Sequence, residues 1–221
     1  MCQPFIRNHQ YNLIKKQAVH LQRTCSTVSD PKVVESVRNN VMYKIQEAFP
    51  DALEPSQEQT LGKVADVYTS EDVQSYLRSL EPYREPFDQM TDAQLRKLFP
   101  KAKKLKLPDR EAVDGRYLTY LGWTDISSNK LYLVYRLDGQ LVGIEGKLTP
   151  THKKGTCFLC NRQEEVALFT AIAKAKPANA SPDYFKAIGN YLCVNSSACN
   201  GNITDVDALE KFVRAVTGRS E

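Results

Sequence analysis

The chain has 221 residues, 42% of them hydrophobic, and a mean hydropathy of −0.46. These values fit a soluble protein of one or two domains, and no apolar run approaches the roughly 18–20 residues that cross a bilayer. Thirty Lys and Arg residues against 26 Asp and Glu residues give a net charge of +4, which is too mild to require a nucleic-acid partner. The first residues lack the pattern of a signal peptide, so we expect a cytoplasmic protein.

The first fifty residues carry the 3.6-residue apolar period of amphipathic helices. One helix is expected from about Asn8 to Thr27. A second is expected to begin at Pro31, because proline is favoured at the first helical position behind a cap at Ser29 or Asp30. His9 and His20 are single histidines, for which we expect a packing or solvent-facing role.

Three more helices are predicted before residue 100. Ser56 with Gln59 has the form of a capping box, and a further helix begins at Ser70. Thr91 with Gln94 forms another box before a short fifth helix. Short connections between amphipathic helices predict antiparallel neighbours, so the N-terminal part is interpreted as a helical bundle.

The pattern changes after a lysine-rich connector. Short apolar runs follow from Tyr117 onward, and Asp138-Gly139 between two of them is a strong hairpin signal, because both turn positions must tolerate positive φ. We therefore predict an α+β protein with an N-terminal helical bundle at residues 1–105 and a C-terminal β-rich domain at residues 106–221.

The connector itself allows two interpretations. Its lysines could contact a phosphate backbone or an acidic surface, or they could form a solvated edge, which we favour. The lysines concerned are Lys101, Lys103, Lys104 and Lys106.

Four of the six cysteines follow the pattern C-x2-C, 32 residues, C-x5-C. A C-x2-C turn places two sulfurs on one side of a tight knuckle, at a separation that suits tetrahedral Zn²⁺. A predicted strand precedes the second pair, and a helix is expected to open at Thr204-Asp205 after it. Knuckle, hairpin and helix in this order predict a treble-clef zinc finger. The ligands are Cys157, Cys160, Cys193 and Cys199.

Disulfides and four unrelated thiols are the alternatives, and both are disfavoured in a cytoplasmic protein. His152 could compete as a ligand, but we favour the cysteines. A closed shell of four thiolates leaves no open position for substrate, so this zinc should be structural and should supply folding free energy. Cys2 and Cys25 are interpreted as unpaired. The chain also lacks HExxH, P-loop, GxGxxG and GxSxG motifs, which favours a protein that is not an enzyme and works by binding.

Four segments together make the chain resemble the FusB-type elongation factor G-binding proteins, which confer fusidic acid resistance. They are "HQYNLIKKQ" at 9–17, "LRKLFPKAKKLKLP" at 95–108, "LGWTDISSNKLYLVYR" at 121–136, and the frame of "GTCFLCNRQEEVALF" and "GNYLCVNSSACN". The resemblance covers nearly the whole chain, and its ordered combination of segments is more specific than the cysteine spacing.

The resemblance implies a helical-bundle domain followed by a treble-clef-like zinc domain. It implies binding to the C-terminal domains of elongation factor G and release of that factor from ribosomes on which fusidic acid has trapped it. This is target protection, in which the drug is neither modified nor bound. The zinc ligands of the family correspond to the four cysteines already named.

The resemblance also implies a partner-binding surface of aromatic and basic residues on the zinc domain. An aromatic anchor with lysines around it is what interface energetics favour. Phe169 and Phe212 lie on apolar faces and could equally belong to the core, so Tyr191 is the preferred candidate. The candidates are Tyr191, Phe212, Phe169, Lys186 and Lys211.

Two alternatives of other classes remain at this point. The first is a ribosome- or RNA-binding zinc protein with a housekeeping role in translation, which would use the connector lysines and would bind less tightly as salt increases. The second is an adhesin for host matrix proteins, which the lack of an export signal disfavours.

Overall fold

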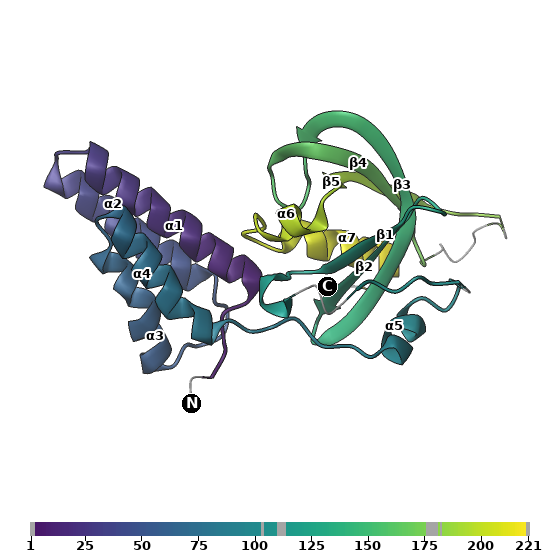
Figure 1. Ribbon diagram of the computed structural model, residues 1–221, viewed down its shortest axis with the longest axis horizontal. Coiled ribbons are helices and arrows are strands. Elements are labelled where there is room, and N and C mark those ends of the chain that lie inside the picture. Colours follow the sequence, from purple (N-terminus) through teal and green to yellow (C-terminus); the bar gives the residue numbers. More distant parts are fainter. Residues whose placement is uncertain (1–2, 103, 110–113, 176–180, 182, 220–221) are drawn as a thin grey trace. The chain divides into compact units, whose positions relative to one another are not determined.

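The computed structural model describes residues 3–102, 104–109, 114–175, 181 and 183–219. The chain divides into two compact units, Met1–Glu85 and Pro86–Glu221, whose elements are labelled in Figure 1. Cys2 and Lys103 lie outside the described residues. Within the described part, no helix is both long and apolar enough to cross a membrane.

The first unit is built from four α-helices, with the short 3-10 helices η1 (Lys63–Asp66) and η2 (Glu81–Tyr83) between or after them. Its core is formed by the apolar stripes of α1, α2 and α4, which follow the helical period. Figure 1 shows α1 and α2 running side by side as a helical hairpin. The α-helices are α1 (Asn8–Thr27), α2 (Pro31–Glu47), α3 (Pro55–Gly62) and α4 (Ser70–Leu80).

The predicted helices are confirmed in this unit, with one correction at a cap. Asp30 caps α2 by accepting a hydrogen bond from the Lys32 amide at 2.8 Å. The third helix begins at Pro55 and not behind Ser56, because Pro55 takes the first helical position that proline favours. Glu54 is therefore its N-cap residue.

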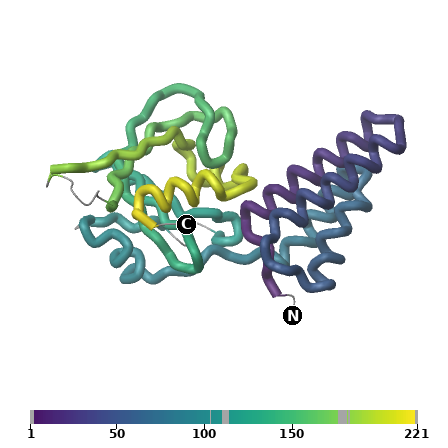
Figure 2. Tube along the Cα trace, turned by 180° about the vertical axis from the view of Figure 1, so that it is seen from behind, coloured from purple at the N-terminus to yellow at the C-terminus, as the bar shows by residue number. Residues whose placement is uncertain are grey.

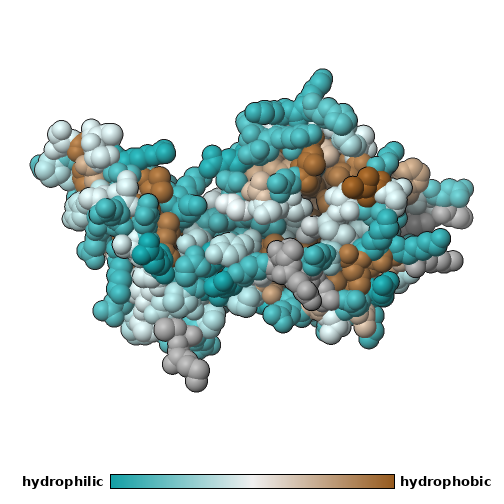
Figure 3. Space-filling model, viewed as in Figure 1, coloured by the Kyte–Doolittle hydropathy of each residue, from teal (hydrophilic) through white to brown (hydrophobic). Residues whose placement is uncertain are grey.

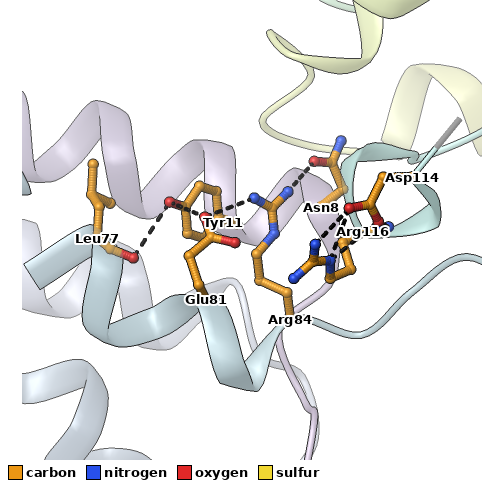
Figure 4. A network of polar contacts seen from close by, with 7 residues as sticks. All are labelled: Asn8, Tyr11, Leu77, Glu81, Arg84, Asp114 and Arg116. Atoms are coloured by element: carbon orange, nitrogen blue, oxygen red, sulfur yellow. Dashed lines mark hydrogen bonds and ion pairs between the residues drawn. The ribbon is translucent and has the colours of Figure 1, made fainter. Parts of the chain in front are cut away.

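A buried arginine ties α1 to the end of α4 (Figure 4). The Arg84 side chain lies over the Tyr11 ring, 4.0 Å from its centroid, and donates to Asn8 Oδ1 at 3.0 Å. Glu81 accepts from both Arg84 (3.2 Å) and the Tyr11 hydroxyl (2.9 Å). The charge is thus both paired and covered by an aromatic face, which is what burial of a guanidinium requires.

The second unit is organised around a five-stranded antiparallel sheet in the order β1-β2-β3-β4-β5. Asp138 and Gly139 form the predicted turn between β2 and β3, with φ of 49° and 72°. The long β3 has an irregularity between Pro150 and Lys153, and Figure 1 shows it curving over the end of the sheet. The strands are β1 (Leu121–Asp125), β2 (Lys130–Leu137), β3 (Gln140–Thr156), β4 (Gln163–Ile172) and β5 (Ala187–Cys193).

The two faces of this sheet pack against different helices. Leu131, Leu133 and their neighbours on one face form a core with α7 (Asp207–Thr217), which is nearest the viewer in Figure 2. Tyr132 and Val134 on the other face pack with α5 (Asp92–Leu98). Because side chains alternate along β2, its residues contribute to two hydrophobic cores, one on each face of the sheet.

The position of α5 corrects the predicted domain boundary. The structure divides the chain after Glu85, whereas we expected the division at 105/106. Phe99, at the end of α5, packs on Tyr132 with ring centroids 5.1 Å apart, so this helix belongs to the sheet unit. Its apolar stripe is visible in the sequence, but the stripe does not reveal which element it covers.

Candidate metal centre

The four cysteines come from three separate segments of the sheet unit. Cys157 and Cys160 lie in the tight turn between β3 and β4, Cys193 is the last residue of β5, and Cys199 lies in the short helix α6 (Ser196–Asn200). The turn is a closed knuckle: the Cys157 amide donates to the Arg162 carbonyl at 3.0 Å, and the Asn161 amide donates to the Cys157 carbonyl at 2.9 Å. Asn161 supplies the left-handed conformation that the turn needs, with φ of 54°.

The sulfur geometry fits a tetrahedral metal ion. All four Sγ atoms lie within 4.8 Å of one another, with 3.7 Å between Cys157 and Cys199 and 3.5 Å between Cys160 and Cys193. A Zn–S bond of about 2.3 Å gives a tetrahedron with edges of about 3.8 Å. A disulfide bond would require about 2.05 Å. The spacing therefore suits four thiolates around one zinc ion, and all four side chains are buried.

The pKa values of the cysteines also favour a metal ion at this site. Hydrogen bonds from the neighbouring thiols, that of Cys160 first, lower the pKa of Cys157 well below its usual range. The same network, headed by the contact with Cys157, raises the pKa values of Cys193 and Cys199. Four thiols this close cannot all ionise without a counter-charge, because their negative charges repel one another. A bound dication removes that repulsion.

A buried hydroxyl beside the cluster adds a further sign of fit. Tyr120 is fully buried, and its hydroxyl makes no hydrogen bond of ordinary geometry in the described part of the chain. Its neighbours include Cys199 and Ser196, and its pKa is raised well above the usual value, first by burial and then by Cys199. An unpartnered buried hydroxyl is costly, and a thiolate held by zinc is the acceptor it lacks.

Asn200, next to the fourth ligand, fixes α6 against the segment before β1. Its Oδ1 accepts from the amides of Thr119 (2.7 Å) and Tyr120 (3.1 Å). Its Nδ2 donates to the carbonyls of Tyr120 and Ser196, each at 3.0 Å. The residue is 1% exposed. Neither Tyr120 nor Asn200 carries a sequence signal, because both act through contacts some 80 residues away in the chain.

His152 is not part of the cysteine cluster. This residue is exposed in the irregular part of β3, with φ of 53°, and is not among the side chains that converge on the site. Four thiolates complete a tetrahedral shell, so the metal would have no open coordination position for a substrate or a reactive water. The site can therefore stabilise the fold of the surrounding segments, but it offers the metal no position for chemistry.

The five predicted partner-binding residues fall into two groups. Tyr191 is 51% exposed on β5, and Lys186 and Lys211 are also exposed. Phe169 and Phe212 are corrected to core residues, because they are 0% and 3% exposed and their rings pack 5.7 Å apart. The apolar periodicity of the sequence places Phe169 on an apolar face of β4 and Phe212 on an apolar face of α7, and in the structure both faces point into the core.

Phe158 is a surface candidate that the sequence did not single out. It lies between the two knuckle cysteines, is partly exposed, and packs on Phe212 with ring centroids 5.3 Å apart. Its amide donates to the Tyr191 carbonyl at 2.8 Å, so the knuckle and β5 are joined at the exposed tyrosine. In the sequence, Phe158 is visible only as an aromatic residue inside C-x2-C, and this pattern does not show that it lies beside Tyr191.

Comparison with known proteins covers both units. A family model described as "Elongation factor G-binding protein, N-terminal" matches residues 5–88, and one described as "FBP C-terminal treble-clef zinc-finger" matches residues 97–216. The solved "Structure of the fusidic acid resistance protein FusC" is similar at 28% identity and a TM-score of 0.79, over 96% of this chain and 97% of that one. A search of curated proteins finds no significant match.

The zinc-finger match spans all four cysteines, whose geometry fits the ion. The predicted treble clef and its cofactor are therefore confirmed: the four thiolates hold one structural zinc ion. When bound, the ion joins the knuckle, the end of β5 and α6.

Proposed function

Since this chain belongs to the FusB-type family of elongation factor G-binding proteins, we propose that it binds elongation factor G through its zinc domain and promotes release of the factor from ribosomes stalled by fusidic acid. The observation that carries the proposal is the match along both units, together with an exposed aromatic side chain, Tyr191, next to the zinc ligand Cys193. This role requires a cytoplasmic protein, because translation takes place there.

The contact surface is proposed to centre on Tyr191, with Phe158 beside it. An exposed tyrosine is a typical interface anchor, because it brings a large apolar surface and a hydrogen-bonding group at a low cost in conformational entropy. The zinc ion would act indirectly, by fixing the knuckle and the end of β5 on which these residues stand. Lys186 and Lys211 are exposed and could meet acidic groups at the rim.

Release of the factor follows from linkage and needs no chemical step. A protein that binds the released conformation of elongation factor G more tightly than the ribosome-trapped one shifts the equilibrium by that difference in affinity. The drug is neither modified nor consumed in this scheme, so the protein acts as a stoichiometric binder and not as an enzyme.

The second candidate, a ribosome- or RNA-binding role for the connector, has weaker support. Lys101, Lys104 and Lys106 are exposed, as RNA binding requires. Lys106, however, lies 3.5 Å from the carboxylate of Asp125, which takes up part of its charge. RNA binding would weaken steeply as salt increases, because it is driven by the release of counterions.

The proposal is tested by reconstituted translation. Ribosomes, elongation factor G and fusidic acid are combined with the zinc-loaded protein, and peptide synthesis is followed. We expect synthesis to recover in proportion to the protein added until it matches the amount of factor, and Tyr191→Ala to abolish the rescue. Rescue that persists in Tyr191→Ala would contradict the proposed contact surface. A lack of rescue despite a formed complex would contradict the release step.

A further inference from the structure

The sheet of the second unit has a face that its helices cover only in part. On this face, α5 packs over Tyr132 of β2, while a groove of about 970 Å³ remains beside it. Strands β3 and β4 form the floor of the groove, the end of α5 forms one wall, and residues leading into β5 form another. Figure 3 shows apolar side chains gathered over this unit with hydrophilic ones around them.

Large apolar side chains are exposed to solvent along the groove. Phe185 is 70% exposed and Ile172 is 53% exposed, and both line it. Leu98 and Phe99 of the α5 segment contribute to the opposite wall. Large exposed apolar side chains that share one concave surface are typical of a binding site.

The charge at the groove is positive. Lys101, Lys147 and Lys174 line it, and none of the three forms an ion pair within the described residues. Glu145 is the one carboxylate among the described lining residues, and it is paired with Lys130 at 3.4 Å. A segment with acidic side chains would therefore meet unpaired lysines and little repulsion.

Tyr191 lies on the same face of the sheet as the groove. In the sheet register, Thr149 of β3 lies opposite Leu168 of β4, and Leu168 lies opposite Tyr191 of β5. Residues directly opposite one another point to the same face of a sheet. Thr149 lines the groove, so Tyr191 extends the same surface toward the zinc site.

We propose that this groove is a second docking site for elongation factor G, taking an acidic segment that inserts apolar side chains between Phe185 and the end of α5. This inference rests on the proposed function and deepens it. Tyr191 and Phe158 form the contact next to the zinc, and the groove takes the adjoining segment of the same partner. The lysines speed the encounter and align the segment, while burial of Phe185 slows dissociation.

The test is titration of purified elongation factor G with the zinc-loaded full chain and four variants. Phe185→Asp removes the apolar wall and should raise the Kd at least about tenfold, and Lys147→Glu should raise it about three- to tenfold. Ile126→Asp changes an apolar residue outside the groove that is even more exposed than Phe185, and Lys15→Glu changes an exposed lysine of α1 outside it; both should bind like wild type. Zinc content and circular dichroism verify that each variant is folded.

A photo-reactive phenylalanine analogue at residue 185 then identifies the occupant. Cross-linking to a peptide of elongation factor G rich in Asp and Glu is expected. If wild type binds and Tyr191→Ala weakens binding, but Phe185→Asp and Lys147→Glu bind normally, the groove proposal is overturned and the proposed function stands. If wild type itself does not bind the factor, the proposed function fails first. Cross-linking to ribosomal RNA would overturn the groove proposal in favour of an RNA site.

Discussion

The sulfur atoms of Cys157 and Cys199 lie 3.7 Å apart although 42 residues separate them in the chain. Both are fully buried, one in the knuckle after β3 and the other in α6. Their proximity brings the knuckle and α6 together at one end of the sheet, and a bound zinc ion would hold them there. The surface proposed to meet the partner therefore depends on a metal ion that would not itself contact the partner.

Removing one ligand should release the ion and loosen this end of the domain. Cys199→Ser is expected to lose the zinc, because a neutral hydroxyl is a poor fourth ligand. A structural zinc contributes on the order of 10 kcal/mol of folding free energy, so the sheet unit should lose its cooperative unfolding transition. Metal analysis and thermal unfolding by circular dichroism measure both effects.

Cys25→Ser is the matched control for that experiment. Cys25 is a free, partly buried thiol of the helical unit outside the metal cluster, so its replacement should retain one zinc per chain. Full zinc occupancy and an unchanged melting curve in Cys199→Ser would contradict the four-thiolate site.

Tyr120 should matter more to the zinc-bound protein than to the zinc-free one. Tyr120→Phe removes a buried hydroxyl that makes no hydrogen bond of ordinary geometry within the described residues, so its main effect should be on zinc binding. If the hydroxyl donates to a zinc-bound thiolate, zinc affinity should fall about tenfold, as for other residues that support metal ligands. Competition with a chromophoric chelator measures this, with Tyr132→Phe as a control on the opposite face of the sheet. Equal zinc affinity in Tyr120→Phe and wild type would rule out the hydrogen bond.

Asn200 should be one of the most sensitive polar residues of the sheet unit. Asn200→Ala leaves the Thr119 and Tyr120 amides and two carbonyls without this side chain, and buried groups left unpaired cost about 1–3 kcal/mol each. We expect a loss of at least about 2 kcal/mol in denaturant unfolding of the zinc-bound protein. Asn202→Ala removes a single contact, a 2.8 Å hydrogen bond to the Ala198 carbonyl, and should cost less than half as much. Equal losses would mean that the Asn200 contacts contribute little.

The helical unit should lose stability in mild acid because of His9. Burial, followed by the charge of Arg7, lowers the pKa of His9 from 6.5 to about 4. Between these values the unfolded chain binds the proton and the folded chain does not, so stability is complete above pH 6.5 and falls as the pH drops toward 4. The loss attributable to this group by pH 4 is about 3 kcal/mol. His9→Gln should flatten this part of the pH profile of thermal unfolding.

An exposed serine of the same helix provides the comparison. Ser26→Ala replaces a side chain that does not titrate, so it should leave the pH profile as it is in wild type. A pH profile of His9→Gln that coincides with that of wild type would show that other groups cause the acid sensitivity.

Features encoded locally could be predicted from the sequence. Pro31, the Thr91–Gln94 capping box and the Asp138-Gly139 turn each determine the conformation of their own segment, and each lies where it was expected. The cysteine spacing also sufficed for the zinc site, because the chemistry of four thiolates allows few alternatives.

Features that depend on packing between distant segments could not be predicted. Periodicity marks Phe169 and Phe212 as members of apolar faces, but only the packed structure shows that these faces meet each other. The stripe of α5 likewise fits a bundle or a sheet equally well. Tyr120 lies beside the cysteine cluster although it is some 80 residues from Cys199 in the sequence, and no local pattern records this proximity.

The most direct test of the central claim is isothermal titration of elongation factor G with the zinc-loaded protein and with Tyr191→Ala, each at two salt concentrations. We expect a one-to-one complex whose affinity falls far less steeply with salt than RNA binding would, and a variant that binds at least about tenfold more weakly. Tyr191 is exposed, so the variant should remain folded with one zinc per chain. A zinc-loaded wild-type protein that does not bind the factor would contradict the proposed function, and a Tyr191→Ala variant that binds as tightly as wild type would contradict the proposed contact surface.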